Sequence, residues 1–500
     1  MLKLKESSKN YICKDCNIIL ISLETLRNDN LPCYGYNKNT APNICGFAKN
    51  SILFEKHYTQ SPYSLPAHAS LFTSLYPNQH NLNFIVKDVL SEEITTLAEV
   101  LKNNNYSTFW SAPLYNPHIP IDKGLERGFD FFENETQDDP IVSWKKTLES
   151  AKKHEKFFVF LHSFKIHEPH FPSNQDLISK FAEKTVEAIP TNWDQIRPRH
   201  MKNLKDNLEN LQALLDEETR THYKEIFDNP KGHEDEILNI ILEKENKYEI
   251  SQELKNKLDG IFRSTWESFI DINNPEHISF LKALYDTQIY EADMAFRNLV
   301  DYLSENNLLD NSIIIVYSPL GEMFNEHSTG LSHAKDLYEL SINTPLIISA
   351  PDLRPQRLKQ PVESIDIMPT LLDMLGIKAP KQLEGISLES LMLDPSEQMK
   401  NRPIVSELGG GTQAESILLG TWKLILNYDE GRPPQELYNL QEDPNENRNL
   451  INKFPEIADQ LQDALNTHKK MRKEYPHKDY EYPEWIDEET RQRLLKKGYF

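Results

Sequence analysis

Cysteine is scarce in this chain, with only four among 500 residues: Cys13, Cys16, Cys33 and Cys45. Four cysteines are too few for a disulfide framework in a chain of this length. Cys13 and Cys16 have the spacing of half a zinc knuckle, but a structural zinc ion would need two more ligands at matching spacing, and none follows closely. The pair therefore indicates a loosely placed N-terminal segment, residues 1–16, rather than a metal site.

A long apolar run is also absent from the sequence. The N-terminal residues contain no apolar core like that of a signal peptide, and the first apolar run, IILISL at residues 18–23, is too short to span a membrane. No later segment reaches spanning length. We therefore expect no membrane span and a cytoplasmic location.

Positive charge is in deficit, because 55 Lys and Arg face 77 Asp and Glu, for a formal net charge of -22. Proteins that bind nucleic acid normally present a basic face, so this balance argues against a nucleic-acid partner. It remains compatible with a local basic pocket for a small anion.

What the sequence does contain is a series of short, β-rich apolar runs separated by stretches with helical apolar spacing. Continuous apolar strands that alternate with helices are typical of a mostly parallel sheet covered by helices on both faces. We therefore predict an α/β fold with a mostly parallel central sheet between helices. The predicted strands are residues 17–23, 106–111, 157–162, 312–317 and 344–349.

Two regions differ in character from this main domain, which we expect to span residues 17–395. Residues 173–277 are charged and helix-patterned, and they indicate a helical insertion between two strands. This insertion is either a solvated decoration, a lid over the site or a surface for a protein partner. Residues 396–500 hold short strand-like runs followed by a charged helical tail, which predicts a small C-terminal α/β subdomain.

Candidate functional residues follow the predicted strands, because ligands bind at the carboxyl ends of strands in an open parallel sheet. Three such ends carry carboxylates, histidines and an arginine. A lone histidine is usually structural, but several histidines at predicted strand ends are less easily explained by chance. These residues are Glu24, Thr25, Arg27, His162, His167, His170, Glu322, His327 and His333.

A separate segment, SPYSLPAHASLFTSLYP at residues 61–77, predicts a helix that begins near Pro66. Ser64 would then lie in the N-cap position, just before the helix. Ser64 is either a helix cap and nothing more, or a nucleophile whose anionic target is held by the helix amides and dipole.

With these residues and motifs, the chain resembles the sulfatases of the alkaline phosphatase superfamily. The resemblance covers nearly the whole length except the insertion. It shows in NIILISLETLRNDNLPCYGYNKNTAPN, SPYSLPAHASLFTSLYP, GLERGFDFFEN, HSFKIHEPHFP and WKLILNYDEGRPPQELYNLQEDPNENRNL, and in the closing DEETRQRLLKKGYF. It implies an alkaline phosphatase-like sheet with a smaller C-terminal unit, and hydrolysis of sulfate esters, with phosphate and phosphonate relatives. It also implies a divalent metal ion, such as Ca, Mg, Mn or Zn, beside the nucleophile.

The resemblance also assigns expected roles to individual residues. Glu24 matches the first metal-binding acid, Thr25 falls where many sulfatases have a second Asp, and Ser64 matches the nucleophile. His68 stands where modified sulfatases carry an Arg that belongs to the signal for conversion to formylglycine, so we expect no formylglycine here. The resulting prediction is Ser64 and His333 for catalysis, Arg27, His68, His167 and His327 for an anionic ester substrate, and Glu24 and Glu322 for metal.

One departure from the family pattern bears directly on activity. In relatives the loop after the fourth run reads Ser-Asp-His-Gly-Glu, whereas here it reads Ser-Pro-Leu-Gly-Glu, with Pro319 and Leu320 in place of the metal-binding pair. Neither side chain can donate to a cation. Three readings stay open: a sulfate or phosphate ester hydrolase with a reorganised site, a non-catalytic pseudoenzyme that binds an anion or a protein, and a metal-independent enzyme with histidine acid–base chemistry.

Overall fold

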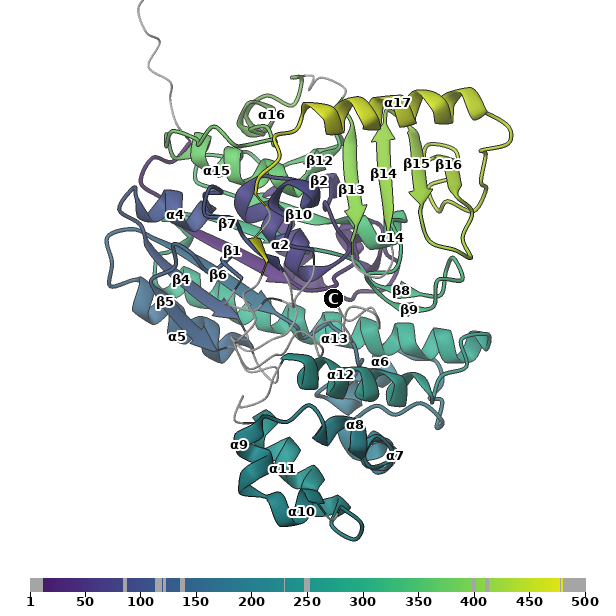
Figure 1. Cartoon of the computed structure of the whole chain (residues 1–500). Helices are drawn as coiled ribbons and strands as arrows, with labels where there is room; N and C mark the ends of the chain where they lie inside the picture. Colours follow the sequence, from purple (N-terminus) through teal and green to yellow (C-terminus); the bar gives the residue numbers. More distant parts are fainter. Residues whose placement is uncertain are drawn as a thin grey trace, which may run out of the picture.

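The computed structural model describes most of the chain in a single fold (Figure 1). Residues 1–11 of the predicted N-terminal segment and residues 480–500, with the closing helix that the resemblance implies, lie outside the described part. The described residues are 12–83, 88–112, 119, 123–134, 140–228, 230–246, 252–397, 402–409, 413–476 and 478–479.

The centre of the described chain is a nine-stranded sheet. β1 pairs in parallel with β6 and β7, β4 pairs in parallel with β5 and β6, and β10 runs antiparallel to β7 and β2. The predicted mostly parallel sheet between helices is therefore confirmed. Its order is β11 (Gln356–Leu358), β2 (Ile52–Tyr58), β10 (Asn343–Ser349), β7 (Ser312–Tyr317), β1 (Asn17–Leu23), β6 (Phe157–Ser163), β4 (Ser107–Ala112) and β5 (Phe131–Asn134), with β12 (Val362–Glu363) beside β2.

Helices cover both faces of this sheet because the strands are apolar on both faces. In β1, Ile18 and Leu20 join one buried cluster, whereas Ile19 and Ile21 join the other. The first cluster is covered by α2 (Ser64–Thr73), α4 (Leu97–Lys102) and α15 (Ile367–Met374). The second is covered by α1 (Pro42–Ala48), α5 (Pro140–Ala151) and α13 (Pro275–Glu305).

The segment predicted as an insertion consists of helices between β6 and α13. Apolar side chains of α7, α8, α11 and α12 form a small core of their own, which includes Leu204, Leu211 and Ile237. In Figure 1 this group of helices lies below α13, on the side away from the C-terminal sheet. Its helices are α6 (Ile178–Phe181), α7 (Trp193–Asp206), α8 (Leu208–Gln212), α9 (Glu217–His222), α10 (Lys224–Asp228), α11 (Glu234–Asn246) and α12 (Gln252–Glu267).

The C-terminal unit is a four-stranded antiparallel sheet with one long helix across it (Figure 1). It contains β13 (Ile404–Leu408), β14 (Ala414–Leu419), β15 (Trp422–Asn427), β16 (Gln435–Asn439) and α17 (Pro455–Met471). Short pairs join β3 (Asp88–Val89) to β17 (Lys478–Asp479) and β8 (Met323–Phe324) to β9 (Leu331–Ser332). The remaining short helices are α3 (Pro77–His80), α14 (Glu339–Ile342), α16 (Glu389–Leu393) and the 3-10 turns Asn28–Asn30, Pro32–Tyr34, Gln175–Leu177, Leu309–Asn311 and Ser364–Asp366.

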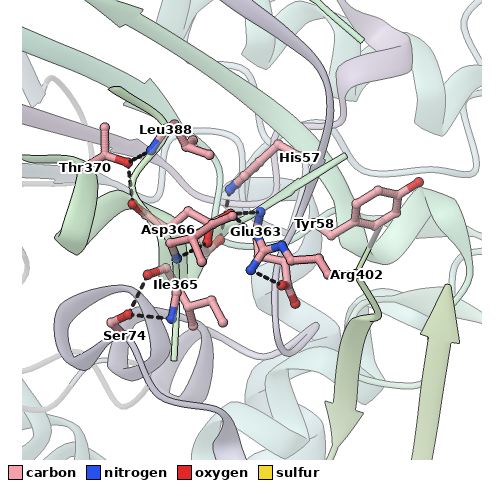
Figure 2. Close-up of polar contacts among 12 residues, drawn as sticks. His57, Tyr58, Ser74, Glu363, Ile365, Asp366, Thr370, Leu388 and Arg402 are labelled. Atoms are coloured by element: carbon pink, nitrogen blue, oxygen red, sulfur yellow. Dashed lines mark hydrogen bonds and ion pairs between the residues drawn. The ribbon is translucent and has the colours of Figure 1, made fainter. Parts of the chain in front are cut away.

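A buried polar network fastens this C-terminal unit to the main sheet (Figure 2). Arg402, just before β13, pairs with Glu363 at 3.1 Å and with Asp366. Next to it, the Ser74 hydroxyl donates to the carbonyl of Ile365 at 2.7 Å. Because Ser74 follows the last residue of α2, the network also anchors the helix that begins with Ser64.

The cysteines are more ordered than the sequence predicts. Cys13 and Cys16 form one disulfide and Cys33 and Cys45 form another. The expectation of a loosely placed N-terminal pair is wrong, because Cys16 is fully buried in the core and the Cys13 amide donates to the carbonyl of Met374 at 3.1 Å. Among the described residues, no helix combines the length and apolar character that crossing a membrane requires.

Candidate active site

The candidate site lies where β1, β6 and β7 end and α2 begins. Glu24 directly follows β1, His162 is the next-to-last residue of β6, and Glu322 lies in the loop after β7. The N-cap of α2 is Tyr63, with extended backbone and no side-chain cap hydrogen bond, and Ser64 is the first helical residue. The predicted N-cap position of Ser64 is therefore wrong by one residue, and its hydroxyl is used elsewhere.

The hydroxyl of Ser64 donates to Oε1 of Glu24 at 2.5 Å, and both side chains are fully buried. Burial raises the pKa of Glu24 to about 8, against the lowering effect of the Ser64 hydrogen bond, and the nearby Glu322 charge raises it further. The hydrogen bond places the ionised form of Glu24 to accept the serine proton.

Two histidines lie beside this pair. His68 is one turn along α2 from Ser64, with Nδ1 2.7 Å from the Ser64 carbonyl and Nε2 3.2 Å from the Ser22 hydroxyl. Nε2 of His162 is 3.4 Å from Oε2 of Glu24, and the two imidazole rings are 5.1 Å apart. Burial lowers the pKa of His68 to about 4, so its ring is neutral and able to donate a lone pair.

These side chains fit a divalent cation. One ligand atom each from Glu24, His68 and His162 lie within 4.8 Å of one another. Oε2 of Glu24 is buried and has no hydrogen-bond partner among the described residues, which leaves a lone pair for a metal ion. Two imidazoles and one carboxylate are a donor set typical of zinc, whereas calcium and magnesium prefer oxygen ligands.

A second group of polar side chains adjoins the first. Nδ1 of His333 is 3.4 Å from Oε2 of Glu322, and the rings of His167 and His333 are 4.8 Å apart. Burial raises the pKa of Glu322 to about 7, and the Glu168 charge adds to this. Burial lowers the pKa of both His167 and His333 to about 4, which keeps both rings neutral. The site thus combines buried acids with neutral histidines.

The loop that carries Pro319 and Leu320 is held by hydrogen bonds of the Ser318 hydroxyl and by a close approach at Gly321. The Ser318 hydroxyl accepts from the amide of Leu26 at 3.0 Å and donates to the carbonyl of Leu320 at 2.7 Å. A Cβ at Gly321 would lie 1.8 Å from the carbonyl oxygen of Leu340, so only glycine fits there. Glu322, predicted as a weak metal ligand, consequently points to His333 and lies close enough to influence Glu24.

Two residues predicted to bind substrate are engaged elsewhere. Arg27 is 4% exposed, and its guanidinium binds Asp29 at 2.6 Å, Glu326 at 2.8 Å and the carbonyl of Glu322 at 3.0 Å. His327 stacks on Tyr338, with ring centroids 3.8 Å apart, on the side of the C-terminal sheet. Arg27 therefore positions the loop, and the surroundings of His327 do not support its predicted contact with substrate.

The structure also gives one candidate residue an unexpected neighbour and brings in residues that the sequence did not indicate. His162 was visible as the end of a buried strand, but nothing in the sequence paired it with His68. Glu168 and Arg263 form an ion pair at 2.6 Å next to His167. No sequence signal marked Arg263, because it comes from the charged insertion.

The sheet order, the serine that opens α2 and the acids and histidines at the strand ends define an α/β fold of the alkaline phosphatase class. The chain belongs to the sulfatase family, whose model, described as Sulfatase, matches residues 16–377. A second model, described as N-sulphoglucosamine sulphohydrolase, C-terminal, matches residues 328–473.

Individual relatives match this chain either over part of its length or at low sequence identity. Arylsulfatase K of Mus musculus is 32% identical over 200 residues, which are 38% of this chain and 36% of the relative, so the match spans little more than a third of that protein. An uncharacterized sulfatase of Escherichia coli (strain K12), YidJ, is 23% identical over 483 residues, or 90% of this chain and 86% of the relative.

Solved structures support the same fold. One, a complex with D-glucosamine-2-N,6-O-disulfate named as its substrate, has a TM-score of 0.65 and 19% identity, covering 91% of this chain and 98% of that chain. The phosphonate monoester hydrolase of Agrobacterium radiobacter has a TM-score of 0.62 and 17% identity, covering 91% of this chain and 95% of that chain. At these identities the likeness concerns the fold.

Proposed function

We propose that this protein hydrolyses sulfate monoesters and that Ser64, as unmodified serine, is its nucleophile. The observation that carries the proposal is the 2.5 Å hydrogen bond from the buried Ser64 hydroxyl to Glu24, at the first turn of α2. Membership of the sulfatase family supports the choice of substrate class.

The side chains suit the steps of such a reaction. Ser64 Oγ attacks the sulfur, and its proton passes to Glu24, the group that already accepts its hydrogen bond. The sulfur–oxygen bond to the leaving group breaks, and that oxygen takes a proton from solvent and leaves as the alcohol. Water then cleaves the seryl sulfate ester, which releases sulfate and restores the Ser64 hydroxyl. His167 and His333, whose rings lie beside each other, would contact the transferred group, and the α2 N-terminus would favour its negative charge.

We further propose that Glu24, His68 and His162 hold a divalent ion of the zinc type. Such an ion, when bound, would neutralise charge on the transferred group. The proposal is supported by the clustering of the three ligand atoms and by the buried Oε2 of Glu24. It would replace the metal ligands lost at Pro319 and Leu320 with nitrogen donors from α2 and β6.

Phosphate or phosphonate monoesters are a second candidate substrate class. The observation in favour is that the residue one turn along the helix from Ser64 is His68 rather than an arginine. The fold likeness to a phosphonate monoester hydrolase is consistent with this class. The predicted non-catalytic alternative would show binding of sulfate without turnover.

The test is turnover of 4-nitrophenyl sulfate, 4-nitrophenyl phosphate and a phenyl phosphonate monoester by protein supplied with zinc, manganese, magnesium or calcium. We expect turnover with zinc or manganese and its loss in Ser64→Ala. Ser70→Ala is the matched control, because Ser70 is a buried serine of the same helix that bonds to His80 at 3.1 Å.

Further measurements separate the alternatives. Mass spectrometry of the Ser64 peptide should find serine, and formylglycine there would overturn the proposed nucleophile. No turnover of any ester with any metal, together with calorimetric sulfate binding, would replace the hydrolase proposal with a binding role.

A further inference from the structure

Helix α12 links the helical insertion to the main domain. Its earlier residues Leu254, Leu258 and Ile261 belong to the insertion's own core. Its later residue Trp266 is 2% exposed and packs in the main core, where its ring lies 5.9 Å from that of His170. In Figure 1, α12 lies directly below α13. The helix is therefore held at both ends, and a side chain between the two cores has a defined position.

Arg263 occupies that intermediate position and points to the candidate site. One nitrogen of its guanidinium is 2.6 Å from Oε1 of Glu168. The Ser332 hydroxyl donates to the same oxygen at 2.6 Å. Glu168 follows His167 in the chain and Ser332 precedes His333, so this ion pair ties the insertion to the two segments that carry the histidine pair.

The surroundings of Arg263 extend to the proposed nucleophile. The carboxylates of Glu168, Glu322 and Glu267 act on its guanidinium, and so does Tyr63, the residue before Ser64, when its phenol is ionised. Burial works against the charge, but these acids raise the pKa of Arg263, so the side chain stays cationic. It therefore lies among the three segments that surround the site.

The guanidinium of Arg263 also retains exposed surface and N–H donors that a ligand could use. Its side chain is 41% exposed, whereas that of Glu168 is 6% exposed. A guanidinium has five N–H donors in a planar fork, and one carboxylate occupies at most two of them. The neighbouring His167 and His333 are neutral, and Arg27 is already bound to Asp29 and Glu326. Lys335 is a second cation near His333, but its ammonium donates to the carbonyl of Leu331 at 2.5 Å.

We propose that Arg263 is a substrate-binding residue for an oxyanion of the substrate, so that the helical insertion forms one wall of the active site. The oxyanion is either the sulfuryl group of the cleaved ester or a second anionic group on the same substrate. This inference rests on the proposed hydrolysis of sulfate esters and extends it to the insertion, which carries the residue.

The experiment compares two sugars that differ in one anionic group, N-acetylglucosamine 6-O-sulfate and glucosamine 2-N,6-O-disulfate, in Arg263→Gln and Arg263→Lys proteins. We expect Arg263→Gln to raise KM roughly 10–100-fold, the effect of losing a charge-assisted hydrogen bond, with a smaller change in kcat. Arg263→Lys should recover part of this loss. A raised KM for both sugars identifies the sulfuryl group as the oxyanion that Arg263 binds. A raised KM for the disulfate alone identifies a second anionic group of the substrate instead.

Arg199→Gln is the matched control, because Arg199 is an insertion arginine that stacks on Phe269 and bonds to Ser268 rather than facing the site. Equal KM values for both sugars in wild-type, Arg263→Gln and Arg199→Gln proteins would overturn the proposal. Because Arg263→Gln leaves Glu168 buried without its partner, the double variant Arg263→Gln with Glu168→Gln removes both charges. The raised KM should persist in this double variant even where thermal stability recovers.

A binding measurement separates this inference from the proposed hydrolysis. Calorimetric titration with inorganic sulfate needs no turnover, and Arg263→Gln should weaken sulfate binding by a similar factor if the sulfuryl group is the ligand. Unchanged binding of sulfate and of both sugars would refute the role of Arg263 whether or not the protein hydrolyses esters. Turnover absent in wild type, with sulfate binding that depends on Arg263, would refute only the hydrolysis.

Discussion

At the scale of single residues, the proposed metal site would exchange ligands rather than simply lose them. Pro319 and Leu320 remove two donors from the loop after β7, while His68 on α2 and His162 on β6 bring two imidazoles to Glu24. Two histidines in place of an Asp-His pair exchange one oxygen donor for a nitrogen donor, which favours zinc, because imidazole suits zinc and carboxylates suit magnesium and calcium. The altered loop is therefore compatible with a metal-binding site.

His162→Gln should weaken zinc binding at least about 100-fold, since even residues that only support a ligand typically contribute 10–100-fold. Calorimetric zinc titration measures this directly. His154→Gln is the control, because His154 lies in an exposed contact with Ser107. Equal zinc affinity in wild-type and His162→Gln proteins would remove His162 from the ligand set.

At the scale of elements, the loop after β7 is held in place by charge. Arg27 binds Glu326 at 2.8 Å and the carbonyl of Glu322 at 3.0 Å, and Lys282 of α13 binds Glu326 at 2.9 Å. The loop is thus tied to the end of β1 and to α13 on either side. Arg27 acts on the site through the position of Glu322.

Glu326→Gln should reduce stability mainly above pH 4.5. Burial opposes ionisation of Glu326, but Arg27 and Lys282 outweigh it and lower its pKa from 4.5 to about 2. A lowered folded-state pKa stabilises the protein above the unfolded value, by about 3 kcal/mol here, and this contribution disappears as pH falls toward 2. Urea unfolding between pH 2 and 7 measures it.

The control for this prediction is Glu305→Gln, at the exposed end of α13. We expect this control to follow the wild-type profile. Parallel stability curves for wild-type and Glu326→Gln proteins across the acid range would contradict the stated role of the ion pairs.

At the scale of the whole molecule, the C-terminal unit depends on the buried network around Arg402 (Figure 2). Burial raises the pKa of Glu363 to about 7 despite the opposing charge of Arg402. Burial also raises the pKa of Asp366, again against Arg402. Removing one member of a buried ion pair leaves the other charge without compensation, and the cost is typically about 3–5 kcal/mol.

Arg402→Met should therefore lower the free energy of unfolding by about 3–5 kcal/mol near pH 8. The loss should be smaller near pH 5, because acids with raised pKa values become neutral in the folded protein as pH falls. Guanidinium denaturation at the two pH values measures both effects. Arg354→Met, at an exposed arginine, should change stability by less than about 0.5 kcal/mol. An Arg402→Met protein as stable as this control would contradict the role of the network.

The cellular location is also a property of the whole molecule. A cytoplasmic location stays a prediction. Disulfides between Cys33 and Cys45 and between Cys13 and Cys16 would be unusual at that location, because cytosolic thiols are normally kept reduced.

The central sheet could be predicted from the sequence because its signal is local. The strand predicted at residues 17–23 coincides with β1, and those at 157–162 and 312–317 agree with β6 and β7 to within one residue. Strands buried on both faces must be continuously apolar, so no distant partner is needed to recognise them. Ser64 and Glu24 could be singled out as candidates for a similar reason, since both adjoin recognisable elements.

The direction of individual side chains was decided only by the tertiary structure. Arg27 and His327 lie in loops, where Arg27 forms ion pairs and His327 stacks on Tyr338, and their contact with substrate stays a prediction. Arg263 meets Glu168 only because α12 packs on both the insertion core and the main core. Sequence patterns report burial along one element, whereas a site depends on which distant elements meet, and that is determined by packing between them.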